Sequence, residues 1–132
     1  MSRQHQFKAR EENILAMAEQ LLLESGDGDI TLDSLADQLD LAKGTLYKHF
    51  SSKDELYLRI IIRDEEQLVE VNRIDDCASA GVARMIFQQL FNPQKAMLLN
   101  QIEERLAASV TGLNRLFGEL YDIRRQRMKR LI

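Results

Sequence analysis

Residues 31–50 constrain the fold of this chain more than any other segment. Two short stretches with helical spacing of apolar residues are separated by only three residues, Asp40-Leu41-Ala42. Small or apolar residues recur five positions apart, at Ala36, Leu41 and Leu46. We expect Ala36 to let the second helix cross closely over the first, Leu41 to fill the turn and Leu46 to anchor the second helix. The segment is therefore predicted to form a helix-turn-helix.

The same periodicity predicts one helix before this segment and one directly after it. The first covers Phe7–Ser25 and stops at Gly26, because glycine readily adopts the left-handed conformation that ends many helices. Thr31 is predicted to cap the first helix of the motif. Ser52 opens a Ser-Lys-Asp-Glu run, the form of a capping box in which Glu55 reaches back, so a long helix should start there.

The remainder also has the pattern of amphipathic helices. A break is expected between Asn72 and Ala80, followed by helical stretches at Gly81–Phe91, Pro93–Val110 and Leu113–Ile132. No segment shows strand alternation. The predicted fold class is all-α. A helix-turn-helix domain over residues 1–52 is joined by a long fourth helix to a helical bundle over 53–132.

Composition argues against several classes of protein. The chain has no run of about 18 uncharged apolar residues that could span a membrane, and its first residues lack the apolar stretch of a signal peptide. Cys77 is the only cysteine, which suits a reducing cytoplasm. We find no metal-ligand cluster, phosphate loop or Ser/His/Asp arrangement, so neither an enzyme nor a cofactor is expected.

Charge is distributed unevenly along the chain, although the net charge is only −3. Residues 1–10 contain three cations and no acid, residues 11–40 contain nine acids and no cation, and residues 41–63 contain five cations against two acids. Such a pattern could confine contact with nucleic acid to one face. Ordinary solvated helix faces explain it equally well.

One string of residues is specific enough to suggest a family. It comprises Lys43-Gly44-Thr45-Leu46-Tyr47-Lys48-His49-Phe50 and then Ser52-Lys53-Asp54-Glu55-Leu56, with Ile14, Ala18, Gly26, Thr31, Leu35 and Ala36 upstream. Over about its first 60 residues the chain resembles the tetracycline-repressor (TetR) family of transcription regulators.

The resemblance implies DNA-binding roles for eight residues. Bases in the major groove would be faced by Lys43, Gly44 and Thr45, and phosphates would be held by Thr31, Tyr47, His49 and Lys53, with Lys48 on the same outward face. Phe50 and Leu56 would belong to the core. Taken one at a time, Tyr47 could instead be a core aromatic, His49 an ordinary surface residue and Lys53 a solvated side chain.

Three residues depart from the family pattern. Asp40 replaces the usual turn glycine, which aspartate can imitate because it tolerates the left-handed conformation. Ala42 replaces the serine or threonine that usually caps the recognition helix, a loss of roughly 1 kcal/mol. Asp27 replaces an aromatic residue after the glycine of the first helix.

The resemblance also implies that residues 53–132 form a helical-bundle regulatory domain for ligand binding and dimerisation, and this domain looks incomplete at its C-terminal end. The implied function is a sequence-specific, DNA-binding transcription regulator. It would bind a palindromic operator in double-stranded DNA as a homodimer, and an unknown small-molecule effector would release it as a repressor. The alternative is a helical interaction module that has lost DNA binding, which the Ala42 substitution and the acidic segment keep open.

Two features of the C-terminal part could bind a ligand or nucleic acid. Ten residues could line an apolar effector pocket, although plain bundle core is the simpler interpretation: Met85, Phe87, Leu90, Phe91, Met97, Leu98, Leu99, Ile102, Phe117 and Tyr121. The basic cluster from Arg124 to Arg130 could contact nucleic acid, but a solvated helix face is expected instead.

Overall fold

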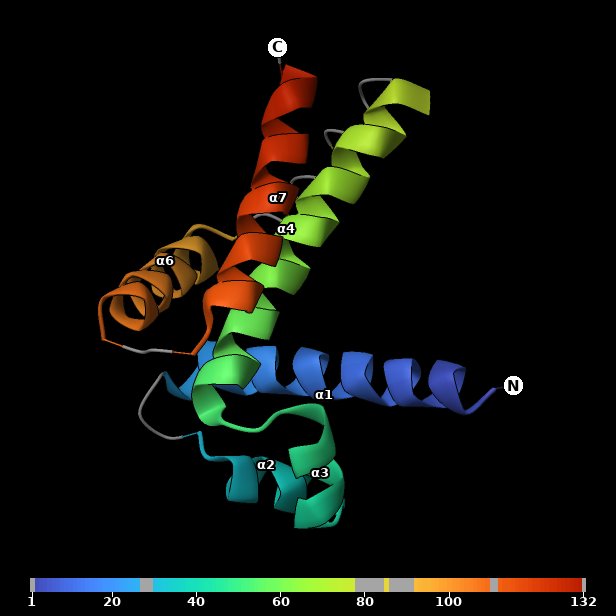
Figure 1. The fold of residues 1–132 in the computed structure, drawn as a ribbon, viewed down its shortest axis with the longest axis vertical. Coiled ribbons are helices and arrows are strands. Elements are labelled where there is room, and N and C mark those ends of the chain that lie inside the picture. The colour runs from blue at the N-terminus through green and yellow to red at the C-terminus, as the bar shows by residue number, and fades with distance from the viewer. Residues whose placement is uncertain (1, 27–29, 78–84, 86–91, 110–111, 132) are drawn as a thin grey trace. The chain divides into compact units, whose positions relative to one another are not determined.

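The computed structural model describes residues 2–26, 30–77, 85, 92–109 and 112–131, and these residues form helices and no strand (Figure 1). The helices are α1 (Arg3–Ser25), α2 (Leu32–Gln38), α3 (Lys43–His49), α4 (Lys53–Cys77), α6 (Pro93–Ser109) and α7 (Asn114–Leu131). The chain divides into two units, residues 1–60 and 61–132, and α4 contributes to both. The all-α prediction is confirmed.

Helix α1 begins four residues earlier than the apolar pattern indicated. Ser2 is its N-cap, and the Ser2 hydroxyl accepts a hydrogen bond of 3.1 Å from the backbone N–H of His5. A serine at this position satisfies one of the free N–H groups of the first turn, so the helix extends to Arg3. At the other end Gly26 has φ +78° and stops the helix, as predicted.

The α2–α3 pair forms the predicted helix-turn-helix. Ala36 and Leu46 are fully buried, and the Leu41 N–H donates to the Ala36 carbonyl at 2.9 Å across the turn. Asp40 occupies the left-handed region with φ 55°, as its position in the turn required. The turn therefore survives without glycine because aspartate can adopt this backbone conformation.

The caps of α2, α3 and α4 differ. The Thr31 hydroxyl caps α2 by accepting from the Ser34 N–H at 3.0 Å, whereas Ala42 gives α3 no side-chain cap. At α4 the Ser52 hydroxyl accepts from the Glu55 N–H at 3.1 Å, as predicted. The Glu55 carboxylate, however, bonds the N–H of Ser51 at 3.0 Å rather than that of the cap residue itself.

In the second unit, α6 starts at Pro93, where the missing proline N–H costs no helical hydrogen bond. The Asn92 side-chain oxygen caps this end by accepting from the N–H groups of Gln94 (3.0 Å) and Lys95 (3.2 Å). Residues of α4, α6 and α7 are buried, among them Ile61, Ile62, Leu99, Ile102, Leu106, Leu116 and Leu120.

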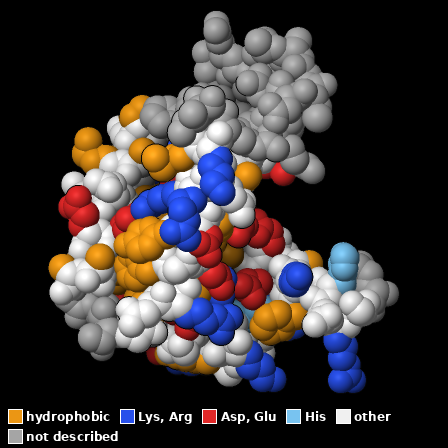
Figure 2. Space-filling view, turned by 45° about the horizontal axis from the view of Figure 1, so that its top comes forward, with side chains coloured by type: hydrophobic (Ala, Val, Ile, Leu, Met, Phe, Trp, Pro, Cys, Tyr) orange, Lys and Arg blue, Asp and Glu red, His pale blue; other side chains and the backbone are white. Residues whose placement is uncertain are grey.

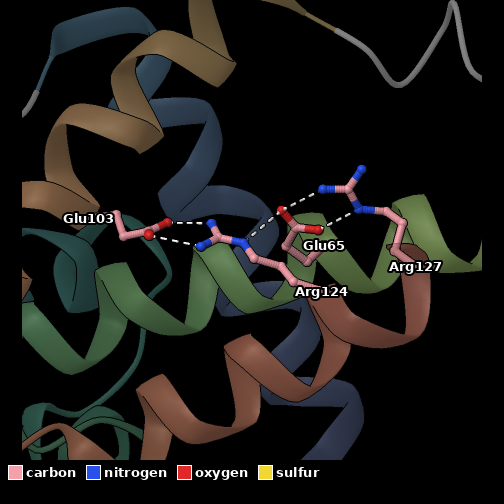
Figure 3. Close-up of polar contacts among 4 residues, drawn as sticks. All are labelled: Glu65, Glu103, Arg124 and Arg127. Atoms are coloured by element: carbon pink, nitrogen blue, oxygen red, sulfur yellow. Dashed lines mark hydrogen bonds and ion pairs between the residues drawn. The ribbon is translucent and has the colours of Figure 1, made fainter. Parts of the chain in front are cut away.

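A charged network links three helices of this unit. Figure 3 shows Arg124 of α7 lying between Glu103 of α6 and Glu65 of α4, with Arg127 on the far side of Glu65. The Arg124 guanidinium bonds both oxygens of Glu103, one at 2.8 Å, and donates to Glu65 at 3.2 Å. The hydrogen bond to Glu103 raises the pKa of Arg124, so this residue stays charged.

Two predictions fall partly or wholly on residues that the structure does not describe. Helix α4 continues to Cys77, and the rest of the Asn72–Ala80 stretch, where a break was predicted, lies outside the described residues. The helix predicted at Gly81–Phe91 lies outside the described residues, apart from Met85. Asp27, which differs from the family pattern, also lies outside them. No helix in the described ranges is both long and apolar enough to cross a membrane. The division at residue 52 proposed from the sequence stays a prediction.

Candidate nucleic-acid interface

Helix α3 presents one polar face on an apolar anchor. Lys43, Gly44, Tyr47 and Lys48 are exposed and Thr45 is half-buried, while Leu46 is fully buried. The five non-buried residues carry a charge, a hydroxyl or bare backbone, which are groups suited to phosphates and base edges. The helix is therefore fixed from one side and free to contact a partner from the other.

Lys43 and Gly44 stand at the start of this face. The Lys43 ammonium lies 3.6 Å from the Asp33 carboxylate of α2, with both side chains more than half exposed. An exposed pair of this kind is weak, so Lys43 can exchange Asp33 for a phosphate or base at little cost. A Cβ placed on Gly44 would meet no atom within 4 Å, so nothing in the protein's own packing requires glycine there.

Hydroxyl groups flank the charged residues. Tyr47 is 48% exposed, so the alternative that it is a core aromatic is excluded. Thr31 is exposed at the start of α2, where its oxygen accepts from the backbone and its own O–H can still donate to a phosphate. Lys53, in the first turn of α4, lies with its ammonium 5.3 Å from the ring centre of the buried Tyr57.

The prediction that His49 points outward is wrong. Its side chain is fully buried, and the ring stacks on Phe7 of α1 with 3.9 Å between centroids and 17° between planes. Its Nδ1 lies 3.4 Å from a Glu11 carboxylate oxygen. The helical spacing of α3 alone could not show that α1 covers this position. A direct phosphate contact would require the ring to leave Phe7.

The contact between α1 and α3 borders a hollow of about 250 Å³. It is lined by Arg3, Gln6, Phe7, Arg10, Thr45, Lys48 and His49. Arg3 and Arg10 were not among the predicted site residues. Their signal was nevertheless present, because positions 3, 7 and 10 share one face of a helix. Since the predicted helix began at Phe7, Arg3 fell outside it.

Exposed basic residues are mixed with acids elsewhere. Figure 2 shows Lys and Arg side chains beside Asp and Glu side chains on the displayed face, without a continuous surface of one sign. The α7 cluster was expected to be a solvated face, and that expectation is wrong for Arg124 and Arg127, which bond the glutamates of the network. Among the described residues, no three His, Cys, Asp or Glu side chains could together hold a metal ion.

Comparison with known proteins supports the assignment of this region. Residues 14–60 match the family model for bacterial regulatory proteins of the tetR family. The chain is 36% identical over 77 residues to the nucleoid occlusion factor SlmA of Vibrio cholerae, covering 58% of this chain and 39% of that protein. It is 37% identical over 60 residues to the HTH-type transcriptional activator FasR of Mycolicibacterium smegmatis, covering 46% and 27%.

The family-model match contains the helix-turn-helix described above. The chain spans about two fifths of the length of SlmA and about a quarter of that of FasR. Within residues 14–60 lie the buried Ala36 and Leu46 that shape the motif and the exposed face of α3. Residues 14–60 of this chain, which contain the helix-turn-helix, are therefore similar to bacterial regulatory proteins of the tetR family.

Proposed function

We propose that the protein is a sequence-specific transcription regulator that reads operator DNA with α3. The observation that carries the proposal is the polar, exposed face of this helix above the buried Leu46. Lys43, Gly44 and Thr45 would face bases in the major groove, because the N-terminal residues of a recognition helix approach base edges. The protein would act by binding DNA in the cytoplasm. We propose no catalytic activity for it.

Phosphate contacts would hold the helix in place. Thr31, Tyr47 and Lys53 would bond phosphates on either side of the groove, and Lys48 would add charge beside them. Such contacts fix orientation without reading sequence, whereas Thr45 would read it. Replacing Tyr47 by Phe should therefore weaken binding to every duplex, and replacing Thr45 by Ala should also change which duplex is preferred.

We further propose that the protein acts as a homodimer on a palindromic operator. Two reading heads must then reach successive major grooves, roughly 34–36 Å apart. A small-molecule effector would release DNA by favouring a different spacing of the heads. Helix α4 is the covalent path for this coupling, because it contributes residues to both units. We propose repression as the outcome of binding, although FasR is named as an activator.

The second unit offers a hollow for the effector. It has a volume of about 210 Å³ and is bordered by α4, α6 and α7. Of the predicted apolar candidates that the structure describes, Leu99 alone lines it, together with the apolar Ile61, Leu68 and Ala96 and with charged residues such as Glu65, Glu103 and Arg124. Ile102 is buried core, and Met85, Met97 and Tyr121 are exposed, while Phe87, Leu90 and Phe91 lie outside the described residues.

The test is fluorescence anisotropy with DNA from upstream of the protein's own gene and with a scrambled duplex of equal length, each at two salt concentrations. Tight binding that favours the first duplex and falls steeply with salt would support the proposal, because phosphate contacts release counterions. Weak and equal binding to both duplexes, followed by the same result with duplexes selected from a random library, would contradict it. The helical interaction module would then be favoured.

A further inference from the structure

The hollow between α1 and α3 gathers cations from both helices. Arg3 and Arg10 come from α1 and Lys48 from α3, and all three side chains are exposed. Within the part of the chain that the structure describes, none of the three forms an ion pair. By contrast, Lys43 on the same helix pairs with Asp33. Three unpaired positive charges around one concavity repel one another, and an anion between them would relieve that repulsion.

The helices that carry these cations are held together by an aromatic contact. Phe7 stacks face to face on His49, and Glu11 lies 3.4 Å from His49 Nδ1. Arg3 and Arg10 occupy the face of α1 that also carries Phe7, one turn before it and one turn after it. The stack therefore positions both arginines beside Thr45 and Lys48 of α3.

A second observation also points to a missing partner. His49 lines the hollow, and its Nε2 is buried without a hydrogen-bond partner among the described residues. Buried polar atoms without partners are uncommon in folded proteins, and a bound ion or an ordered water is one explanation for them. The residues that line the hollow thus include three unpaired cations and a histidine with an unsatisfied ring nitrogen.

We propose that this hollow is a phosphate-binding site that takes a backbone phosphate of the operator, with Arg3 and Arg10 as its direct ligands. The Lys48 ammonium would complete it. DNA is the favoured source because Lys48 lies on α3 among the residues proposed to contact the operator, so the nearest phosphates are those of the bound duplex. Phe7 and His49 act as positioning residues. The inference rests on the proposed function and adds α1 to the interface.

The experiment compares the chain carrying both Arg3→Gln and Arg10→Gln with the unaltered chain and with Lys8→Gln. Lys8 is an exposed cation of α1 that does not line the hollow, so it controls for loss of general positive charge. We expect the double variant to bind both cognate and scrambled duplexes roughly tenfold or more weakly. The slope of log affinity against log salt should fall in magnitude by about 1. Circular dichroism should show unchanged helix content.

A second measurement locates the contact on the DNA. Neutral methylphosphonates replace the operator phosphates one at a time, and the affinity of both proteins is measured for each duplex. The unaltered chain should lose affinity at a phosphate in each half-site where the double variant loses none, because the two changes remove the same interaction.

Several outcomes would overturn the inference while leaving the proposed function intact. One such outcome is that the unaltered chain selects its operator and that the double variant and Lys8→Gln both bind this operator as tightly as the unaltered chain does. Another is a methylphosphonate profile that the two arginine substitutions do not change. Inorganic pyrophosphate that binds the unaltered chain but not the double variant, and does not compete with DNA, would identify a free phosphorylated ligand instead. An unaltered chain that selects no duplex would contradict the proposed function itself.

Discussion

Helices α3 and α7 are both rich in basic residues, yet they use them in opposite ways. On α3, Lys43 and Lys48 are exposed, and Lys43 pairs with the exposed Asp33 of α2. On α7, Arg124 and Arg127 are largely covered and bond Glu65 and, for Arg124, Glu103. The first arrangement leaves charge available to an external anion, and the second satisfies it inside the fold.

The difference follows from what each helix packs against. Arg124 and Arg127 are three residues apart and share a face of α7, where glutamates from α4 and α6 meet them. Lys48 shares its face of α3 with Thr45 and borders a hollow that contains further cations. A count of basic residues in a segment therefore does not show how many of them can bind DNA.

Among substitutions that test this contrast between α3 and α7, we expect the largest effect, a loss of stability, at Arg124. Replacing Arg124 by Gln leaves Glu65 and Glu103 mostly buried with one cation fewer. We expect the free energy of unfolding to fall by about 2 kcal/mol, less than for a fully buried pair because the arginine side chain is partly exposed. Denaturation in urea, followed by circular dichroism, measures this change.

Arg125 provides the matched control for that experiment. It is exposed and pairs with the exposed Asp122, so Arg125→Gln should change the free energy of unfolding by less than about 0.5 kcal/mol. Neither variant should alter the salt dependence of DNA binding. Equal stability of the two variants would show that the α7 network contributes no more than a surface pair.

Lys48 should show the opposite behaviour. Replacing Lys48 by Gln is expected to weaken DNA binding by roughly tenfold at low salt, since it removes one phosphate contact. The free energy of unfolding should stay within about 0.5 kcal/mol, because the side chain is exposed. Lys129→Gln, an exposed change on α7, is the control and should leave anisotropy titrations unaltered. If Lys48→Gln lowered the free energy of unfolding by more than it lowered the free energy of DNA binding, the contrast between α3 and α7 would be wrong.

Replacing Gly44 tests whether this glycine serves the binding of DNA rather than the packing of the protein. A Cβ at this position meets nothing, and alanine favours helix over glycine, so Gly44→Ala should raise stability by up to about 1 kcal/mol. Binding to the operator should nevertheless weaken several-fold, because the methyl group would keep DNA from the backbone. Thermal unfolding and anisotropy measure the two effects, and unchanged affinity would argue against close approach here.

The smallest effect concerns the missing cap of α3. Ala42→Ser would supply a hydroxyl for the free N–H groups of the first turn, and stability should rise by about 0.5–1 kcal/mol. Ala16→Ser, at an exposed position inside α1, is the control and should give no gain. A chemical denaturation series with both variants separates the cap from a general effect of serine.

The ends of helices could be predicted from the sequence where a glycine, a proline or a capping residue sets them. The ends set by Gly26 and Pro93 and the start of α4 after Ser52 were predicted and confirmed. The start of α1 was placed too late, because capping by Ser2 depends on a hydroxyl and not on apolar periodicity. The division near residue 52 and the DNA contacts of individual residues stay predictions.

The site was predictable to the extent that it lies on one helix. The turn geometry of Asp40 and the burial of Phe50 and Leu56 matched the expectation. The direction of His49 did not, because a helix has several faces and its sequence does not say which of them another helix covers. Arg10 was missed for the same reason.

By itself, the sequence determined the helix-turn-helix, because its five-residue spacing and its short turn involve neighbours in the chain whose backbone geometry is set locally. Only the tertiary structure decided which charges and rings are available. His49 meets Glu11 across 38 positions, and Arg124 meets Glu65 across 59. Contacts at such separations depend on how whole helices pack, and that packing pairs Arg124 and Arg127 with glutamates while it leaves Lys48 facing outward.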